Sequence, residues 1–124
     1  AGRSFSFLKV VTNSEIVGWS EFTGISEILR RRGLTAVIES LLNPLVGRDP
    51  RHIERISSDL QTATRQSPSG LNHQAIGAIQ NALLDIKAKS LELPVYALFG
   101  GPVRHRIPLN WSHFALLAYI LQYH

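Results

Sequence analysis

A helix pattern that ends in a proline turn and a double glycine, within Ala82–Gly101, most constrains the fold of this 124-residue chain. Large apolar residues recur at helical spacing before and within this stretch, namely Ile76, Ile79, Leu83 and Ile86. Small residues lie beside them, namely Ala75, Ala78 and Ala82. Such a stripe predicts a helix with one face in a core, and the alanines permit close packing. Asn72 is its predicted N-cap. Pro94 starts a last short helix, which Gly100 and Gly101 end.

The first 22 residues have a different pattern, which predicts a β-hairpin. Ser4–Thr12 is rich in β-branched and aromatic residues, typical of a strand. Side chains alternate between its two faces, with Leu8 and Val10 on one and these on the other: Phe5, Phe7, Lys9 and Val11. Asn13–Glu15 is predicted to turn and Ile16–Phe22 to form the second strand. Because a lone hairpin is marginal in water, it needs a third strand or a helix layer.

Two further helices are predicted between the hairpin and the last long helix. Ile25–Leu34, which contains the arginine run and Gly33, is typical of a loop. Thr35 is predicted to cap a short helix that ends at Leu42. Asp49 as N-cap and Pro50 as first helical residue predict a helix to about residue 65. Its apolar stripe comprises Ile53, Ile56, Leu60 and Ala63.

Strands first and helices after predict one α+β domain, an antiparallel hairpin or meander followed by a bundle of three to four helices. The composition, 44% hydrophobic and 18% charged, is typical of a globular protein and not of a disordered one. The absence of cysteine excludes disulfides and thiol chemistry. No apolar run approaches the ~20 residues of a membrane span, and we expect a cytoplasmic protein by default.

Four blocks, in order, resemble the mandelate racemase/muconate lactonizing enzyme branch of the enolase superfamily. Ile16–Glu21 is similar to its GIVGWGE block, with Ser20 where glycine is common. Leu45–Pro50 is similar to its LVGRDP block. Asp85–Lys89 and Leu93–Gly101 are similar to parts of its DIKGKALGLPVYQLLGG block. In combination these blocks identify a fold more firmly than they identify a chemistry, because their glycines and prolines serve turns and caps.

The resemblance implies that residues 4–101 are the N-terminal capping domain of such an enzyme. Residues 102–113 would be a linker and the start of the first barrel strand, and residues 114–124 form an apolar tail unlike the family. The catalytic barrel, and the family's first strand upstream of Ala1, are expected to be absent from this chain. The implied chemistry is Mg²⁺-assisted abstraction of a proton alpha to a carboxylate, as in an acid-sugar dehydratase or a racemase. No catalytic residue, metal ligand or cofactor is expected here, and Mg²⁺ belongs to the full-length enzyme.

Two segments are candidates for contact with a substrate, through Glu21, Phe22, Thr23, Trp111 and His113. The resemblance implies that the loop after the second strand, at about 21–30, leans over the mouth of the barrel. Ile107–Leu109 resembles the first barrel strand, and barrel sites lie at the C-terminal ends of strands, so the residues after it would point into the site. The alternative is structural, in which Glu21 ends a strand and Phe22 packs in the core.

Lys87 and Lys89 resemble a catalytic pair but stand in a helix pattern. In the family, a Lys-x-Lys pair on a barrel strand supplies the general base, because residues i and i+2 of a strand share one side. On a helix the two side chains diverge by about 200°. We therefore expect both lysines to be solvated. The scattered carboxylates and the five histidines show no metal-ligand spacing.

Two other functions stay open at this point. The chain could be a non-catalytic interaction or oligomerisation module that uses its helices or an unpaired strand edge. Less favoured is a small nucleic-acid binder, because the net charge of +4 is densest at Arg30–Arg32 and elsewhere mixed with acids. For the enzyme hypothesis, the partners are a carboxylate or acid-sugar substrate, bound only with a barrel domain, and further copies in a homo-oligomer.

Overall fold

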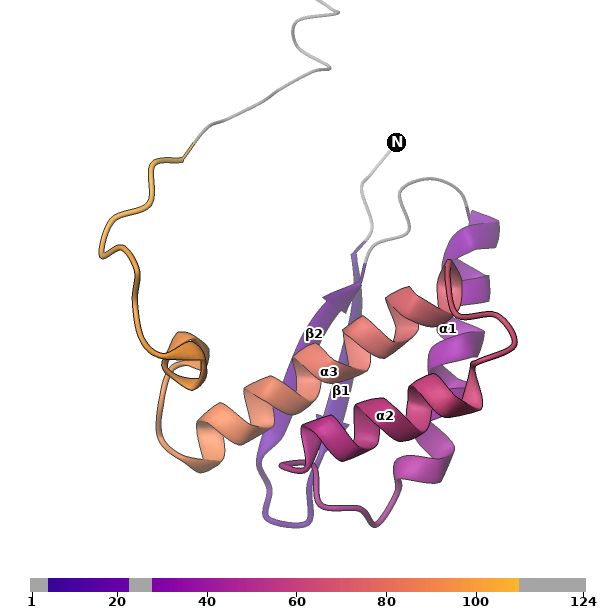
Figure 1. Ribbon diagram of the computed structural model, residues 1–124, viewed down its shortest axis with the longest axis horizontal. Helices are drawn as coiled ribbons and strands as arrows, with labels where there is room; N and C mark the ends of the chain where they lie inside the picture. Colours follow the sequence, from indigo (N-terminus) through magenta and orange to yellow (C-terminus); the bar gives the residue numbers. More distant parts are fainter. Residues whose placement is uncertain (1–4, 23–27, 110–124) are drawn as a thin grey trace, which may run out of the picture.

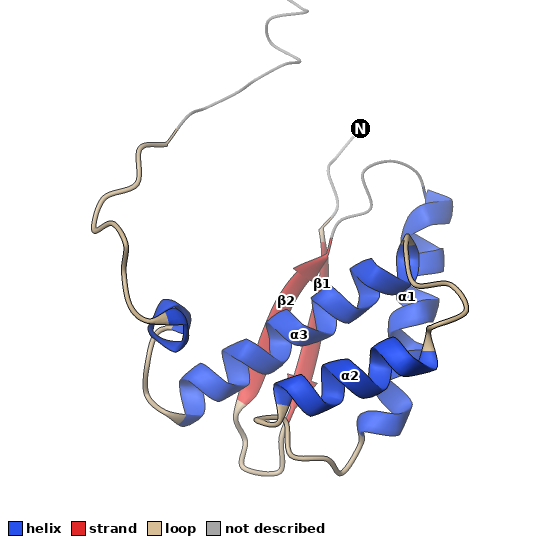
Figure 2. Cartoon of the chain, in the orientation of Figure 1, coloured by secondary structure: helices blue, strands red, loops and turns tan. Residues whose placement is uncertain are grey.

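The computed structural model describes residues 5–22 and 28–109 of the 124. In this part, strands β1 (Ser6–Val11) and β2 (Val17–Phe22) precede three α-helices, α1 (Ile28–Leu42), α2 (Ile53–Ala63) and α3 (Leu71–Ser90). Two 3₁₀ turns, η1 (Asn43–Leu45) and η2 (Val95–Phe99), follow α1 and α3. Helix α3 crosses the hairpin and packs against both strands, α1 and α2 (Figure 1). Figure 2 shows the result, a sheet layer under a helix layer, which confirms the predicted α+β order.

The hairpin directs one of its faces to the helices. Leu8 pairs with Ser20 in antiparallel register, and both are buried. The alternate positions face outward and are exposed, among them Phe5, Phe7, Val11 and Trp19. The predicted alternation is confirmed, because successive strand side chains point to opposite sides of a sheet. The predicted turn at Asn13–Glu15 is confirmed as well, with Glu15 in the left-handed region at a φ of 64°.

Helix α3 supplies the centre of the core. The whole predicted stripe and its flanking alanines are buried: Ile76, Ile79, Leu83, Ile86, Ala75, Ala78 and Ala82. Side chains of α1 and α2 complete the core around them, namely Leu34, Ile38, Leu41, Ile53, Ile56 and Leu60. The prediction for Ala63 was wrong, because α2 ends at this residue and leaves its side chain exposed.

Helix α1 begins earlier than the sequence predicts. We expected a loop through Ile25–Leu34 and a helix from Thr35, but the helix already includes Ile28. The expectation was wrong because arginine and leucine are good helix formers and because one buried stripe spans both segments, formed by Leu34, Ile38 and Leu41. Gly33 is accommodated within the helix, where an added Cβ would lie only 3.2 Å from Leu71 Cδ1.

Helix α2 begins later than predicted. Asp49 and Pro50 were expected to start it, but regular helix begins at Ile53, with His52 in the N-cap position. The Asp49 carboxylate instead accepts hydrogen bonds from the Arg51 backbone N–H at 2.9 Å and from the Arg51 guanidinium at 2.7 Å. These bonds close a turn ahead of the helix, so the acid caps the turn rather than the helix.

Helix α3 is confirmed, but its N-cap is not the predicted one. Asn72 lies within the first turn, and Gly70 occupies the N-cap position with a φ of 65°. The Asn72 side-chain amide donates to the Ser67 carbonyl at 2.7 Å. Asn72 thus ties the helix start to the preceding loop rather than capping a free N–H group.

A compact C-terminal cap ends α3. The Leu93 N–H donates to the Ala88 carbonyl at 3.0 Å and the Glu92 N–H donates to the Lys89 carbonyl at 3.1 Å, which is the Schellman pattern. Glu92 is the left-handed residue of this cap, at a φ of 54°. As predicted, Pro94 then introduces the short helix η2, which ends at the left-handed Gly100. Residues 107–109, expected as the start of a barrel strand, have no regular structure and are exposed.

Candidate substrate-facing residues and the contacts around them

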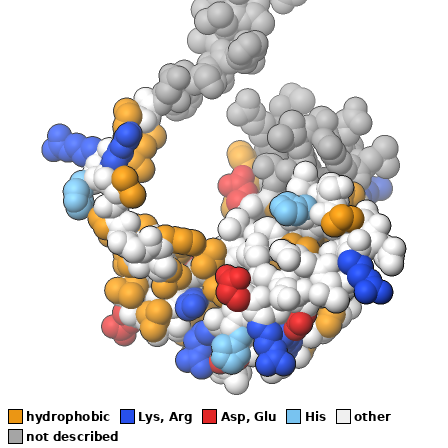
Figure 3. Space-filling view, in the orientation of Figure 1, with side chains coloured by type: hydrophobic (Ala, Val, Ile, Leu, Met, Phe, Trp, Pro, Cys, Tyr) orange, Lys and Arg blue, Asp and Glu red, His pale blue; other side chains and the backbone are white. Residues whose placement is uncertain are grey.

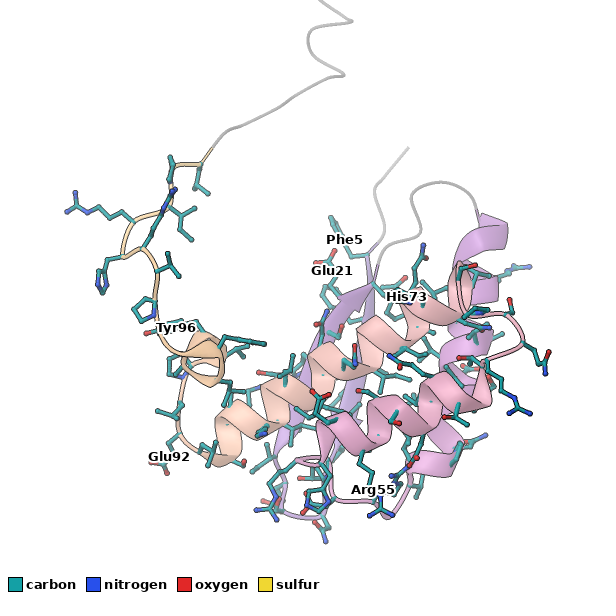
Figure 4. All side chains as sticks on the ribbon, in the orientation of Figure 1. Phe5, Glu21, Arg55, His73, Glu92 and Tyr96 are labelled. Atoms are coloured by element: carbon teal, nitrogen blue, oxygen red, sulfur yellow. The ribbon has the colours of Figure 1, made fainter. Side chains whose placement is uncertain are left out.

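Two of the five candidate substrate residues lie in the described part of the chain, at the end of β2. Glu21 is exposed on the outer face of the sheet, and its strand partner is Phe7. Phe22 is half-buried and packs against the core, as its structural alternative predicts. Figure 4 places Glu21 at the end of the sheet nearest His73, far from Glu92 and Tyr96. The other three candidates, Thr23, Trp111 and His113, lie outside the described residues.

Two of the sequence blocks meet where β2 crosses α3. Gly18 is buried, and an added Cβ there would collide with the Ala82 carbonyl oxygen and press on the Ile86 side chain. Only glycine permits the strand backbone to approach the helix this closely. The glycine of the Ile16–Glu21 block therefore has a packing role, which fixes β2, and with it Glu21, relative to α3.

Asp85 and Lys89 hold the same strand from its outer edge. The Trp19 N–H donates to Asp85 Oδ2 at 2.9 Å, and Lys89 Nζ donates to the Val17 carbonyl at 2.8 Å. Lys89 Nζ also lies 2.7 Å from Asp85 Oδ2, an i,i+4 ion pair. The expectation that Lys87 and Lys89 lie on a helix is confirmed. The Lys89 ammonium is not simply solvated, however, because it binds the strand.

The loop before α2 is held by two ion pairs. Arg48 lies 2.7 Å from Asp59 of α2, and Arg51 lies 2.7 Å from Asp49. The hydrogen bonds from Arg51 hold the pKa of the Asp49 carboxyl well below its usual range. The same pair raises the pKa of the Arg51 guanidinium. The two charged residues of the Leu45–Pro50 block, Arg48 and Asp49, therefore have a local structural role in stabilising this loop.

Two of the hollows on the surface of the described domain are lined by residues of α2, α3 or β1. One, of about 540 Å³, lies between the start of α2, α3 and η2, and its lining mixes basic, acidic and apolar side chains: Arg51, His52, Glu54, Arg55, Lys87, Leu84 and Phe99. The other, of about 380 Å³, lies beside β1 and reaches down to core residues Ile56, Ile79 and Leu83. Neither hollow is lined by Glu21 or Phe22.

Apolar side chains are exposed throughout the segment that follows α3. Large hydrophobic residues stand open to solvent from the helix cap to the end of the described chain: Leu91, Leu93, Val95, Tyr96, Phe99, Val103, Ile107 and Leu109. Figure 3 shows apolar side chains gathered over η2, whereas those further along the segment that leaves the domain stand among Arg and His side chains. An exposed apolar cluster such as the one over η2 is typical of an interface.

Neither a metal site nor a membrane span is present in the described residues. In 5–22 and 28–109, no three acidic or histidine side chains lie close enough together to hold a metal ion. Over that same part of the chain, no helix combines the length and apolarity that a bilayer span requires.

The comparisons with known proteins agree with the four blocks. The model of the mandelate racemase/muconate lactonizing enzyme N-terminal domain matches residues 2–100. The chain therefore belongs to this family, and its α+β fold is that of an enolase-superfamily N-terminal domain. The resemblance that the sequence predicts is thus confirmed over residues 2–100.

Sugar-acid dehydratases are among the similar proteins. A D-galactonate dehydratase family member from Cellvibrio japonicus is 39% identical over 115 residues, which are 90% of this chain and 27% of that protein. A D-galactonate dehydratase from Pectobacterium atrosepticum is 40% identical over 103 residues, which are 82% of this chain and 26% of that protein. This chain thus spans about a quarter of the length of the relatives it matches.

Solved structures share the fold at similar coverage. A Burkholderia xenovorans protein assigned as an L-alanine-DL-glutamate epimerase is 46% identical, with a TM-score of 0.79 over 86% of this chain and 26% of its own. A second structure of it holds magnesium and fumarate. An Agrobacterium radiobacter enolase assigned as a galactarate dehydratase holds sodium and L-malate, and is 30% identical with a TM-score of 0.73 over 81% of this chain and 25% of its own.

Proposed function

We propose that this chain is the capping domain of an enolase-superfamily enzyme that removes a proton alpha to a carboxylate, an acid-sugar dehydratase or a racemase. One observation supports this most directly: the family match over residues 2–100, together with about 40% identity to D-galactonate dehydratase relatives of which the chain covers about a quarter. In this proposal the chain covers and shapes a site whose chemistry is supplied by the rest of the enzyme. A cytoplasmic location stays a prediction.

The reacting groups are assigned to the part of the relatives that this chain does not span. Magnesium, fumarate and L-malate occupy two of the related structures, which is consistent with a metal-dependent site for small carboxylic acids. The described residues of this chain form no metal site of their own, so we assign them no step of the reaction. In this proposal, then, the isolated chain is inactive.

The end of β2 is the part of the described chain that we propose faces the substrate. Glu21 is exposed there, while the same strand is fixed by the close approach at Gly18 and by the contact from Asp85 to Trp19. A side chain on a rigid element can be held in a defined position relative to a ligand. A carboxylate at this place would accept hydrogen bonds from the hydroxyl groups of an acid sugar.

A chimera tests the proposal. This chain replaces the matched N-terminal quarter of the Pectobacterium atrosepticum D-galactonate dehydratase, and exchange of the alpha proton of D-galactonate is followed by NMR in D₂O with Mg²⁺. We expect exchange by the chimera and none by this chain alone or by the remaining three quarters alone. Exchange catalysed by this chain alone, or a folded chimera without activity, would contradict the proposal.

Glu21 is tested in the same chimera against a matched acid. Glu21→Ala should raise KM roughly tenfold with little change in kcat, because a lost hydrogen bond to a charged group weakens substrate binding by about that factor. Glu39→Ala, which removes an exposed acid on α1, is the control and should leave both constants unchanged. An equal effect of the two changes would remove Glu21 from the substrate-facing set.

An interaction module is the second candidate. The outward face of the hairpin exposes a cluster of large apolar side chains that includes Phe5, Phe7, Val11 and Trp19, as a homo-oligomer contact would. Sedimentation of the isolated chain over a range of concentrations distinguishes this role, since Phe7→Ser should then shift the chain towards the monomer. No observation beyond the arginines of Arg30–Arg32 supports nucleic-acid binding.

A further inference from the structure

The backbone of β2 is bonded to two side chains of α3 around Gly18. The Trp19 N–H donates to Asp85 Oδ2 at 2.9 Å, and the Lys89 ammonium donates to the Val17 carbonyl at 2.8 Å. The ammonium also lies 2.7 Å from the same carboxylate oxygen, Asp85 Oδ2, so the two contacts are joined. A closed ring of hydrogen bonds therefore encloses the residue between Val17 and Trp19.

This ring reproduces the bonding pattern of a parallel β bridge. In a parallel pair, one residue of the neighbouring strand donates its N–H to the carbonyl before a central residue and accepts from the N–H after it. Here Lys89 supplies the donor, Asp85 supplies the acceptor, and Gly18 is the central residue. The two side chains meet because residues four apart lie one above the other on a helix. The pair, which we call the edge clamp, therefore holds β2 as a parallel strand would.

The edge clamp grips β2 at two points, both before the end of the strand. One point would leave a pivot, whereas bonds at Val17 and at Trp19 fix the direction of the strand as well as its place. Glu21 lies four residues beyond Val17, about 13 Å along the strand, so a rotation of ~10° about that point would displace it by about 2 Å. A binding group must be held within roughly 0.5 Å of its productive place. Small changes at the clamp are therefore large at Glu21.

We propose that Asp85 and Lys89 are positioning residues for the end of β2, and that their edge clamp sets where the Glu21 carboxylate meets the substrate. This inference rests on the proposed role of Glu21, and neither clamp residue contacts the substrate in it. Of the two lysines in the Lys-x-Lys pattern, Lys89 thus acts through the strand that it binds, while Lys87 has no part in the clamp.

Loss of the clamp should move the strand end without unfolding the domain. The buried side chains of α3, such as Ile79 and Leu83, keep the helix on the sheet. The Asp85 and Lys89 side chains are 24% and 46% exposed, so removal of one leaves the other in contact with water rather than as a buried unpaired charge. Variants at these two positions can therefore report on position separately from folding.

A double-mutant cycle in the dehydratase chimera tests the link to Glu21. Asp85→Ala should raise KM by up to about tenfold, the change expected of Glu21→Ala, with little change in kcat. In the double variant the two effects should not add, because a misplaced carboxylate and a missing one lose the same hydrogen bond. Asp85→Asn keeps an acceptor oxygen for the Trp19 N–H and should restore most of the KM.

The matched control for this cycle is Asp59→Ala, which removes the acid of another 2.7 Å ion pair, on α2. This change should leave KM as it is. If Asp85→Ala and Glu21→Ala raise KM by factors that multiply in the double variant, or if Asp85→Ala has no effect where Glu21→Ala has one, the edge clamp does not act through Glu21 and the proposal is wrong.

Residual dipolar couplings of the isolated chain separate this proposal from the proposed function, because they need no activity. In Asp85→Ala the N–H directions of Trp19 and Glu21 should rotate together relative to α3, and in Asp59→Ala they should not. Lys89→Met removes a single ammonium and should rotate them in the same sense by less, which covers the case in which Asp85→Ala does not fold. Unchanged directions in a folded clamp variant overturn the proposal. Rotation combined with a Glu21→Ala chimera of unchanged KM would instead locate the error in the role assigned to Glu21.

Discussion

Helix α3 and the segment that follows it are adjacent in sequence but opposite in burial. In α3, side chains such as Ile79 and Leu83 are at most 4% exposed. After the cap at Glu92, Tyr96 is 55% exposed and Phe99 is 70% exposed, although both are large hydrophobic residues. In the described residues the buried hydrophobic core therefore ends with α3, and the large apolar side chains beyond it are exposed.

The first prediction contrasts one leucine from each region. Leu83→Ala removes a side chain that is 4% exposed and should cost about 2–5 kcal/mol of unfolding free energy through lost packing and a cavity. Leu93→Ala, at a leucine 47% exposed, should cost no more than about 1 kcal/mol. Urea denaturation followed by circular dichroism measures both. Equal losses would mean that the segment is part of the core.

The second prediction concerns the contact that fixes α3 on the sheet. Gly18→Ala places a methyl group against the Ala82 carbonyl and should destabilise the chain by about 1–3 kcal/mol, because backbone must shift. Gly77→Ala is the control, since nothing lies within 4 Å of the added carbon on that helical glycine. Gly77→Ala should be stabilising or neutral. If Gly18→Ala left the unfolding free energy unchanged, the close approach of β2 to α3 would be disproved.

The third prediction concerns the boundary between the two regions. Glu15 and Glu92 are the non-glycine residues with positive φ in the described chain. The family block GIVGWGE has glycine at the position of Glu15, and the block DIKGKALGLPVYQLLGG has glycine at the position of Glu92. Glu92→Gly and Glu15→Gly should each stabilise the chain by about 0.5–1 kcal/mol, because glycine adopts this conformation without strain. The two residues belong to separate turns, so the effects should add in the double variant. Glu39→Gly, within α1, should destabilise instead.

The smallest expected effect is a dependence of the unfolding free energy on pH, which arises from Asp49 in the loop before α2. Because Arg51 lowers the pKa of folded Asp49, this carboxyl stabilises the fold above its ordinary pKa and loses that contribution as the pH falls towards the lowered value. The unchanged chain should therefore be more stable than Asp49→Asn at neutral pH, with the difference narrowing below about pH 4. A difference that widens in acid would reverse the sign of this coupling.

The sequence predicted what depends on local pattern and failed where distant contacts decide. The stripe of α3 and the alternation in β1 were readable because one periodic signal specifies each. The start of α1 was missed because Gly33 and the arginine run suggest a loop, while the burial of Leu34 against other helices favours a helix. Propensity is a weak signal that tertiary packing overrides.

The candidate site shows the same division. That Asp85 and Lys89 form an i,i+4 pair was available from the sequence, but their bonds to Trp19 and Val17 join residues 66 and 72 positions apart. Only the approach permitted by Gly18 brings them together. Whether Glu21 faces a substrate is a question about a neighbouring domain, and no local signal in the chain can answer it.

Hydrogen–deuterium exchange tests the account most directly, by comparing the isolated chain with the dehydratase chimera. The account predicts slow exchange throughout the core of α3 in both proteins. Residues 91–109 should exchange rapidly in the isolated chain and become protected in the chimera, where the rest of the enzyme covers their apolar side chains. We propose that this segment meets the catalytic part of the enzyme, and fast exchange of it in an active chimera, or slow exchange already in the isolated chain, would contradict that proposal.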